Sequence, residues 1–431
     1  MSSTPFAEDR SLAPGAAGPS AADRIAARVV VHQLAGLSGG AIRLVLPDGA
    51  VLRFGDPSSG PSARIEVVRW RAFRRLVTGG DLAAAESFMD GDWSSDDLVA
   101  VVRLFVRNAE RFDRESPFAR VTNWGNRLLH AARRNTLAGS RRNIEAHYDL
   151  GNAFYALFLD ETMTYSCALF SRPDETLEEA QLNKWRHVAE LARLGPGLSV
   201  LEIGCGWGGF AAYAAKEYGC RVTGLTLSTE QMARAKEHAR KEGVAALVDV
   251  RLTDYRALPE EGRTFDRIVS IEMLEAVGYE YLGRFFATCE ALLSREGLAV
   301  FQAITVPDHR HDRLLARPDF IKKHVFPGSH VPSLAAITSA LAQNTTLFVD
   351  GLEEIGPHYA ETLRRWRTRF LGRRAEAAAL GFDERFLKMW EYYLAYCEGG
   401  FVERYVNDVQ FVLTRSGNRA LGPLPAYRGA P

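Results

Sequence analysis

Short apolar runs alternate with longer amphipathic stretches from about residue 200 onwards. The runs have the composition of buried strands, and the stretches have the period of helices. In order, the pattern predicts a strand at 221–225, a helix at 228–242, strands at 248–252 and 267–271, a helix at 280–293 and a strand at 298–304. This order is typical of a doubly wound α/β sheet, in which ligands bind at the carboxyl ends of the strands. The residues at or just past such ends, which we expect to line one crevice, are Glu202, Thr226, Tyr255 and Ile271.

A different pattern precedes this region. In order, it predicts a β-hairpin at 41–54 around Pro47-Asp48-Gly49, helices at 67–76 and 81–89 separated by Gly79-Gly80-Asp81, and an apolar stripe from Leu98 to Phe105. The glycine pair supplies a helix stop, and the aspartate supplies a new N-cap. We therefore predict a small α+β domain over residues 23–118, with a packing or substrate-presenting role.

The stretch Val200-Leu-Glu-Ile-Gly-Cys-Gly-Trp-Gly-Gly-Phe210 joins an apolar run to an alanine-rich segment. Its glycines at 204, 206 and 209 fit a strand, a tight turn and a helix whose amino end approaches a ligand. The same spacing satisfies the dinucleotide fingerprint G-x-G-x-x-G, which has many false matches. Other residues must therefore decide between the two kinds of ligand.

Glu202 and the following strand favour S-adenosylmethionine (SAM) over a dinucleotide. A carboxylate at the strand end would repel a pyrophosphate but accept hydrogen bonds from a cationic amino-acid head group. The next strand, 220–226, ends in threonine, whereas a nicotinamide-binding domain would place an acid near there for the ribose. A dinucleotide, or a turn without a ligand, is the alternative.

Composition limits the other classes of function. A chain of 431 residues exceeds the usual size of a single core, so we expect two domains or one large domain with additions. The 53 basic and 53 acidic residues balance, which argues against bulk nucleic-acid binding. No uncharged apolar run approaches the ~20 residues needed to cross a bilayer, so membrane contact would be peripheral. The scattered cysteines lack a C-x-x-C pair, which suits a reducing cytoplasm, and we predict no metal site.

Two segments have an unusual composition. Residues 1–22 are rich in Ser, Ala, Pro and Gly and lack the features of a signal peptide, so we predict a disordered tail. Residues 120–142 contain several arginines, with interspersed leucines and Trp124, and no acid. This basic linker, assigned to 119–142, is predicted to lie on an anionic membrane surface, where each basic side chain contributes about 1 kcal/mol. A solvated interdomain linker is the alternative.

Four strings occur in a fixed order along the chain: Tyr148-Asp-Leu-Gly-Asn152, Thr164-Tyr-Ser-Cys167, Leu201-Glu-Ile-Gly-Cys-Gly-Trp-Gly208 and Gly224-Leu-Thr-Leu-Ser228. Together they resemble the cyclopropane-fatty-acyl-phospholipid synthase family, which includes the mycolic-acid cyclopropane synthases. The resemblance implies a SAM-dependent methyltransferase domain over 143–415 and a C-terminal tail at 416–431. Residues 23–118 resemble the extra N-terminal domain of the bacterial phospholipid enzymes.

The implied fold class is α/β: a doubly wound, Rossmann-like class I methyltransferase sheet with the small α+β domain in front. Compared with a minimal methyltransferase, residues 308–356 form a long insertion, which we predict to be a helical substrate cover. Further helices are predicted from His358 and over 389–401, followed by a strand at 409–413. Their apolar and aromatic residues suit an acyl-chain tunnel and a simple helical core equally well.

The resemblance implies that the methyl group of SAM is transferred to the cis double bond of a phospholipid acyl chain. Attack of the π bond on the sulfonium methyl creates a carbocation, and loss of a methyl proton to a bound bicarbonate closes a cyclopropane. The implied bicarbonate contacts are Cys167, Glu275, Ile304 and Tyr359, and Cys397 matches a cysteine once suspected of catalysis. For each of these residues a purely structural role is the alternative, above all for Cys397 as a buried thiol.

One residue departs from the family pattern. Gln302 stands where the synthases carry a histidine, and glutamine forms hydrogen bonds but does not titrate. If glutamine preserves the anion site, the product is a cyclopropane, which we favour. If the base has changed, the cation resolves into a methylene- or methyl-branched chain.

The resemblance also implies the SAM contacts, with Tyr255 stacked on adenine or, alternatively, simply exposed beside Asp254. These contacts are Tyr165, Ser166, Glu202, Gly204, Cys205, Gly206, Gly208, Thr226, Leu227, Ser228, Gln231, Tyr255 and Ile271. Two other functions stay open, a small-molecule methyltransferase and a non-catalytic lipid-binding protein. We expect a cytoplasmic protein at the inner face of the membrane, with a homodimer as a candidate assembly and no nucleic-acid partner.

Overall fold

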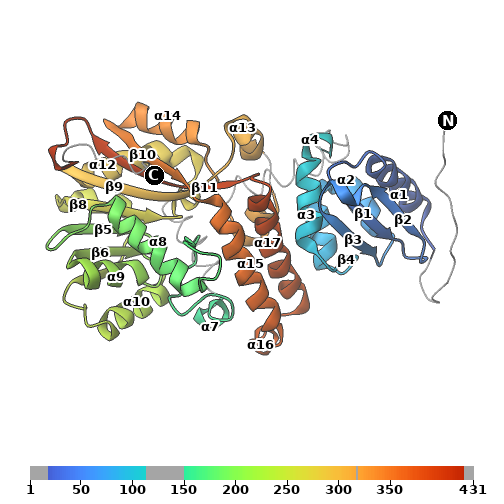
Figure 1. Cartoon of the computed structure of the whole chain (residues 1–431), viewed down its shortest axis with the longest axis horizontal. Coiled ribbons are helices and arrows are strands. Elements are labelled where there is room, and N and C mark those ends of the chain that lie inside the picture. Colours follow the sequence, from blue (N-terminus) through green and yellow to red (C-terminus); the bar gives the residue numbers. More distant parts are fainter. Residues whose placement is uncertain (1–17, 113–149, 317–318, 422–431) are drawn as a thin grey trace. The chain divides into compact units, whose positions relative to one another are not determined.

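The computed structural model describes residues 18–112, 150–316 and 319–421 (Figure 1). Contacts divide the chain into two compact units. One unit combines residues 1–132 with 316–325 and 366–405, and the other combines 133–315 with 326–365 and 406–431. The predicted basic linker, most of the predicted N-terminal tail, residues 143–149 with the first two residues of the first family string, and residues 422–431 lie outside the described residues.

The larger unit is built on a seven-stranded sheet with the order β10-β11-β9-β8-β5-β6-β7 (Figure 1). Strands β5 to β9 pair in parallel, whereas β11 is antiparallel to both β9 and β10. The chain leaves β5 towards β6 and β7 and then returns to β8 on the other side, so the topological switch lies between β5 and β8. The predicted doubly wound α/β sheet is confirmed. The strands are β5 (Ser199–Ile203), β6 (Arg221–Thr226), β7 (Val248–Leu252), β8 (Phe265–Ile271), β9 (Leu293–Thr305), β10 (Leu347–Glu354) and β11 (Asn407–Arg415).

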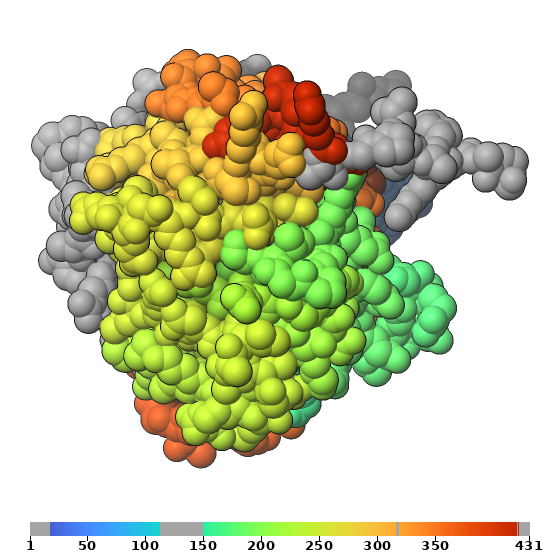
Figure 2. Space-filling view, turned by 90° about the vertical axis from the view of Figure 1, so that its left-hand side faces the viewer, coloured from blue at the N-terminus to red at the C-terminus, as the bar shows by residue number. Residues whose placement is uncertain are grey.

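Helices cover both faces of this sheet because successive side chains of a strand point to opposite sides. In β5, Leu201 and Ile203 enter one apolar cluster, which also contains residues of α12 and α14. Val200 enters a second cluster with residues of α8 and α9. Green and yellow segments, which run from β5 to β9 with the helices between them, form the face of this unit seen in Figure 2. The helices are α7 (Asn152–Tyr155), α8 (Leu177–Leu191), α9 (Gly209–Tyr218), α10 (Thr229–Lys241), α11 (Leu274–Val277), α12 (Leu282–Leu292) and α14 (Leu334–Asn344).

The predicted insertion at 308–356 needs a correction. Residues 308–316 form α13 (Asp308–Ala316), and a π-helical turn spans Ile321–Val325. However, α14 contributes Ile337 and Leu341 to the core, and β10 pairs with β11. Residues 334–354 therefore belong to the sheet and its covering helices and are not a substrate cover. Strand β10 was not predicted from the sequence, because its side chains are mostly exposed at the edge of the sheet. It therefore lacks the alternation of apolar and polar residues that marks a half-buried strand.

The N-terminal part of the other unit is an α+β fold with a four-stranded sheet in the order β2-β1-β3-β4. The predicted hairpin is confirmed, since β1 and β2 are antiparallel and Ile42 lies opposite Phe54. Helix α1 and strand β3 were not predicted. The predicted break between two helices is confirmed, because α2 consists of two helical segments separated by a kink at Gly80, where φ is 63° and ψ is −147°; the first segment begins at Arg71 and not at residue 67. The elements are α1 (Ala21–Leu34), β1 (Ala41–Val45), β2 (Val51–Gly55), β3 (Ser62–Val67), α2 (Arg71–Met89), β4 (Trp93–Ser95), α3 (Leu98–Arg107) and α4 (Ala109–Phe112).

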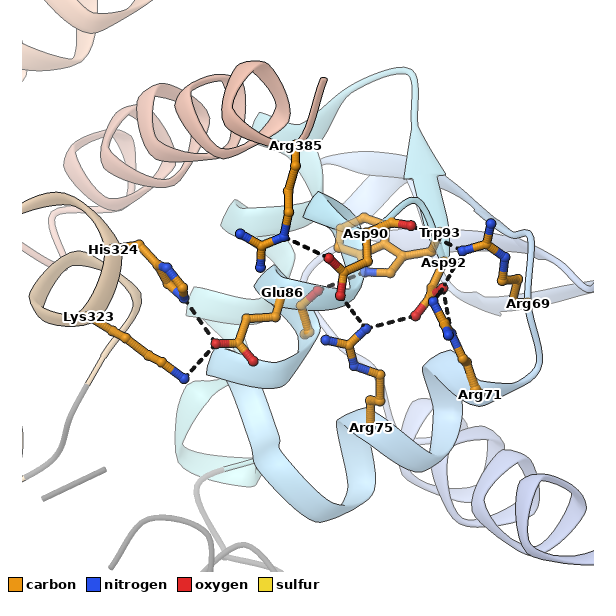
Figure 3. A network of polar contacts seen from close by, with 11 residues as sticks. Arg69, Arg71, Arg75, Glu86, Asp90, Asp92, Trp93, Lys323, His324 and Arg385 are labelled. Carbon is orange, nitrogen blue, oxygen red and sulfur yellow. Dashed lines mark hydrogen bonds and ion pairs between the residues drawn. The ribbon is translucent and has the colours of Figure 1, made fainter. Parts of the chain in front are cut away.

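Distant segments join this unit through charged side chains (Figure 3). Helix α17 (Glu384–Val402) packs on α2 and α3, and its Arg385 forms an ion pair with Asp90 at 2.9 Å. In the π-helical turn, Lys323 and His324 contact one oxygen of Glu86 at 2.7 and 3.0 Å. This grouping cuts across the predicted boundary between 23–118 and 143–415. The remaining helices are α15 (Gly356–Gly372) and α16 (Arg374–Ala379), and among the described helices none is both long and apolar enough to cross a bilayer.

A buried aspartate is at the centre of the same network (Figure 3). The side chain of Asp92 is fully buried and accepts from Arg69, Arg71 and Arg75 at 2.8 to 3.0 Å. Burial alone would raise the pKa of Asp92, but the hydrogen bonds from the arginines outweigh it and hold the pKa below its ordinary value. A buried carboxylate needs such partners, so we assign this cluster a structural role.

Candidate active site

The turn after β5 has the geometry that its glycines require. Gly204, Gly206 and Gly208 have φ values of 83°, 51° and 82°, in the left-handed region, and α9 begins at Gly209. A Cβ on Gly208 would lie 2.7 Å from the Cβ of Ala235, so the turn packs closely on α10. The predicted strand, turn and helix are confirmed, and the amino end of α9 faces the carboxyl edge of the sheet.

Glu202 is the second-last residue of β5, just before the glycines. It is buried, and its Oε2 atom has no hydrogen-bond partner among the described residues. Burial raises the pKa of Glu202 to about 8, while the charge of Lys184 acts in the opposite direction. A buried acceptor without a donor costs about 1–3 kcal/mol. A cationic amino group would supply both the missing donor and the missing charge, so this carboxylate fits the head group of SAM.

The loop after β6 is rigid and polar. Thr226 Oγ1 and Gln231 Oε1 are 2.8 Å apart, and the amide of Ser228 donates to Thr226 Oγ1 at 3.1 Å. Ser228 also caps α10 by accepting from the amide of Gln231 at 3.3 Å. Leu227 lies within the same loop, partly buried. The residues predicted to contact SAM here are thus held in one fixed turn.

Two further predicted contacts lie at the ends of the neighbouring strands. Tyr255 follows β7, is partly buried and meets the ring of Phe285 edge-on, with centroids 5.2 Å apart. Ile271 is the last residue of β8 and is also partly buried. Because β8, β5, β6 and β7 are adjacent and parallel, their carboxyl ends lie along one edge. The sheet therefore brings the predicted SAM residues of four strands to the same side.

An aromatic segment before α8 borders the glycine turn. Trp207 in the turn donates its Nε1 hydrogen to Asn152 Oδ1 at 2.6 Å. Tyr165 contacts the rings of Tyr155 and Phe326, with centroids 5.3 and 6.4 Å away. Adjacent Ser166 accepts from Lys184 Nζ at 2.7 Å through its hydroxyl. The predicted Thr164-Tyr-Ser-Cys segment is thereby attached to α8.

Lys184 is fully buried in α8, next to this segment. Burial lowers the pKa of Lys184 to about 8, although the nearby charge of Glu272 opposes the shift. A pKa near 8 leaves most of these side chains cationic at neutral pH. The site therefore contains a buried positive charge that can balance one carboxylate.

Glu272, which the sequence analysis did not select, lies at the centre of the second part of the site. Its Oε1 accepts from the backbone amide of Cys167 and from Gln302 Nε2, each at 2.7 Å. Its Oε2 accepts from the hydroxyl of Tyr359 at 2.6 Å. The three predicted residues Cys167, Gln302 and Tyr359 thus converge on one carboxylate.

The orientation of Gln302 follows from its neighbours. Gln410, directly opposite on β11, donates its amide to Gln302 Oε1 at 2.9 Å. The Gln302 amide nitrogen therefore faces Glu272 and, at 2.9 Å, Asp408 Oδ2. Asp408 is fully buried, and burial together with the charge of Glu272 raises its pKa far above the ordinary value. We infer that Asp408 is neutral and that Glu272 carries the charge of the pair.

Glu275 and Ile304 form a second contact of the same cluster. The amide of Ile304 donates to Glu275 Oε1, and Glu275 Oε2 has no partner among the described residues. Burial and the charge of Glu272 raise the pKa of Glu275 to about 8, so the group is mostly protonated at neutral pH. The predicted residues Cys167, Glu275, Gln302, Ile304 and Tyr359 are therefore brought together.

The two cysteines among the predicted catalytic residues contribute no reactive thiolate. Burial raises the pKa of the Cys167 thiol well above its ordinary value, and this residue contributes its backbone amide to the site. Burial likewise raises the pKa of Cys397, which lies on α17 in the other compact unit. A neutral thiol is a poor nucleophile, so the structural role that was the alternative for Cys397 fits its surroundings.

Glu272, Lys184, Asp408 and Gln410 were not predicted from the sequence. The sequence did contain a signal for Glu272, because this residue directly follows an apolar strand and lies three residues before Glu275. Asp408 and Gln410 alternate along β11, which indicates one shared face, but the apolar residues around them masked the pattern. Lys184 had no signal, since a lysine in an amphipathic helix usually lies at the surface.

Comparison with known proteins shows the family of the chain. The sequence model of the family described as mycolic acid cyclopropane synthetase matches residues 136–411. The chain belongs to this family. The resemblance found in the sequence is thereby confirmed, and the class I methyltransferase fold with it. Members of this family are SAM-dependent methyltransferases, and this chain is one of them.

Three relatives show the extent of the similarity. Tuberculostearic acid methyltransferase UfaA1 of Mycobacterium tuberculosis is 38% identical over 413 residues, which cover 93% of this chain and 92% of the relative. The cyclopropane-fatty-acyl-phospholipid synthase of Escherichia coli is 36% identical over 351 residues, covering 81% and 87% of the two chains. A crystal structure of the mycolic acid cyclopropane synthase CmaA1 complexed with SAH and CTAB is 32% identical, covers 64% of this chain and 98% of its own, and has a TM-score of 0.59.

Proposed function

We propose that this methyltransferase transfers the methyl group of SAM to one carbon of the cis double bond in an acyl chain of a membrane phospholipid. The observation that supports this best is that the chain has two features in the same unit. One is the edge of the sheet that carries the residues predicted to bind SAM (the SAM edge), and the other is a buried cluster of acidic residues. Glu202 and the glycine turn form the first, and Glu272 with its three donors forms the second. An ordinary transfer to nitrogen or oxygen would not require so many buried acids, whereas a carbocation must lose a proton in a dry pocket.

The chemistry begins when the π electrons of the double bond attack the sulfonium methyl. The C–S bond breaks, a C–C bond forms, and the neighbouring chain carbon becomes cationic. Aromatic faces stabilise cations and exclude water, and the rings of Tyr155, Tyr165 and Phe326 lie in contact beside the SAM edge. These rings are therefore candidates for shielding the cation.

The product depends on where the electrons go when the methyl carbon loses a proton. If the C–H pair bonds directly to the cationic carbon, a cyclopropane closes, which is our first candidate. If a hydride first shifts from the methyl-bearing carbon to the cationic carbon, loss of the methyl proton leaves a methylene (C=CH₂) branch on the chain. Two observations favour this second product enough to test it: Gln302 replaces a titratable residue, and UfaA1, which matches nearly the whole chain, is named a methyltransferase.

A bound bicarbonate, predicted from the resemblance, does not fit the residues present. Three donors that would hold it, on Cys167, Gln302 and Tyr359, already donate to Glu272. An anion placed among them would also meet the charge of that carboxylate. The proposed reaction therefore has no step that uses bicarbonate. The contact with an anionic membrane surface, assigned to residues 120–142, remains part of the proposal.

The test uses SAM labelled in its methyl group and vesicles of a phospholipid with cis-unsaturated chains. Label in the lipid fraction, and none with a saturated phospholipid, is the expected result. Proton NMR of the product separates the two candidates, because cyclopropane methylene protons resonate far upfield of vinylic ones. Absence of label in every lipid, with label in a soluble small molecule instead, would replace this function by small-molecule methylation.

A further inference from the structure

We propose that the Glu272 carboxylate is the proton acceptor of the reaction, built into the chain in the position where the family resemblance places a bicarbonate. Turnover would then need no added bicarbonate. This inference rests on the proposed function, because it names the base that completes the same reaction. The step transfers a proton from the methyl carbon to a Glu272 oxygen, and the released C–H pair forms the new C–C or C=C bond.

The hydrogen bonds place Glu272 more firmly than a surface carboxylate would be placed. Both of its oxygens accept, and the donors come from segments far apart in sequence: the loop before α8, β9 and α15. Residue 272 as a whole is partly exposed, whereas its donors Cys167, Gln302 and Tyr359 are buried. The three donors thus fix the position of the carboxylate within the site.

The backbone at Glu272 supports a functional assignment. Its φ of 51° lies in the left-handed region, which favours glycine and costs other residues about 1–3 kcal/mol. Such conformations persist where the surroundings impose them, and they gather at active sites. Here the strained position, directly after β8, directs a carboxylate to the carboxyl edge of the sheet.

The charges around Glu272 suit a base. Asp408 and Glu275 are both inferred to be neutral near pH 7, so neither competes for the proton. Lys184 supplies a buried positive charge that offsets the carboxylate. Burial raises the pKa of Glu272 itself, while the hydrogen bonds from Tyr359 and Cys167 act in the opposite direction. A carboxylate of raised pKa is a stronger base than one with the ordinary pKa.

The first experiment replaces Glu272 by glutamine, which keeps the shape but cannot accept the proton. Product formation from labelled SAM and vesicles should fall by about 100-fold or more, the usual effect of removing a general base. SAM binding, measured by calorimetry, should change little, because Glu202 lies in the other part of the site. Glu260→Gln, the same substitution at an exposed position, should behave as wild type and serves as the matched control.

The second experiment replaces Glu272 by glycine, which suits the local φ and opens the space that the carboxylate fills. Assays run in buffers purged of carbon dioxide, with bicarbonate then added back. Wild-type turnover should not respond, whereas Glu272→Gly should be nearly inactive and gain activity that saturates with bicarbonate. Nitrate has a similar planar shape but is a very weak base, so it should not restore activity. A residue that merely supports the fold would show no such rescue.

Two outcomes would overturn the proposal. One is a wild-type enzyme that loses activity without bicarbonate and regains it on addition. The other is a Glu272→Gln variant that is folded by thermal unfolding and turns over at the wild-type rate. Both differ from failure of the proposed function, in which the wild-type enzyme labels no lipid under any condition.

Discussion

The affinity for SAM should depend on pH through Glu202, because only the ionised form of this carboxylate can pair with the ammonium group of SAM. With a pKa of about 8 in the free protein, roughly a tenth of these carboxylates are ionised at pH 7 and about half at pH 8. If the ionised form accepts from the SAM ammonium group, affinity should rise about fivefold between pH 7 and pH 8 and level off above. The rise runs in this direction because burial raises the pKa and the ligand selects the charged form.

The Glu202→Gln variant should lose both the affinity and its pH dependence. A charge-assisted hydrogen bond is worth about 1.5–3 kcal/mol, which corresponds to a dissociation constant roughly 10- to 150-fold higher. This loss should be largest above pH 8, where the wild-type carboxylate is ionised before SAM arrives. Below pH 8 the wild-type protein must release a proton on binding, so the difference should shrink.

Calorimetric titration with SAM in two buffers of different ionisation enthalpy measures both quantities. The wild-type protein should release close to one proton for each SAM at pH 7, and the variant should release none from this group. The amino group of SAM also titrates, but it does so equally for both proteins, so the ratio of their affinities isolates Glu202. An unchanged ratio from pH 6.5 to pH 9, or affinities within twofold of each other, would show that Glu202 does not bind the head group.

Three further predictions concern single substitutions. Asp92→Asn should lower the free energy of unfolding by about 1–3 kcal/mol at pH 7, because Arg69, Arg71 and Arg75 lose the buried charge that they contact. The pKa of Asp92 in the folded protein lies below its ordinary value of 3.8, so the stabilisation is complete above pH 3.8 and is lost as the pH falls through the folded pKa. Denaturant titrations of the wild type and the variant at pH 7 and pH 3.5 should therefore show a smaller difference in the free energy of unfolding at the lower pH. Gly208→Ala should lower the free energy of unfolding by about 1–3 kcal/mol and weaken SAM binding, because the new methyl group would lie 2.7 Å from the Cβ of Ala235 at a left-handed φ. Thermal unfolding and calorimetry measure the two effects. An unaltered melting temperature would contradict the packing argument. Cys397→Ala should retain most of its turnover in the lipid assay, whereas near-complete loss in a folded variant would return this thiol to the catalytic candidates.

The sequence by itself determined the features that depend on local physics. Strand and helix periods predicted β6 to β9 and their helices closely, because a parallel strand is buried on both faces and reads as an apolar run. The glycines after β5 predicted their own turn, since left-handed φ values are cheap only for glycine. The family resemblance then located Cys167, Gln302, Glu275 and Tyr359, which the structure brings into one cluster.

Only the tertiary structure decided what lies at the centre of that cluster. Glu272 becomes the shared acceptor of donors up to 105 residues away because the sheet order sets β8 beside β9 and brings the loop before α8 to the same edge. The neutral state of Asp408 likewise depends on burial and on its neighbours, neither of which is visible in one strand. The same holds for β10, an exposed edge strand, and for α17, whose place beside α2 depends on pairs such as Arg385 and Asp90. Local rules predict elements, whereas the charge and hydrogen bonding of a buried side chain are set by whatever the fold places around it.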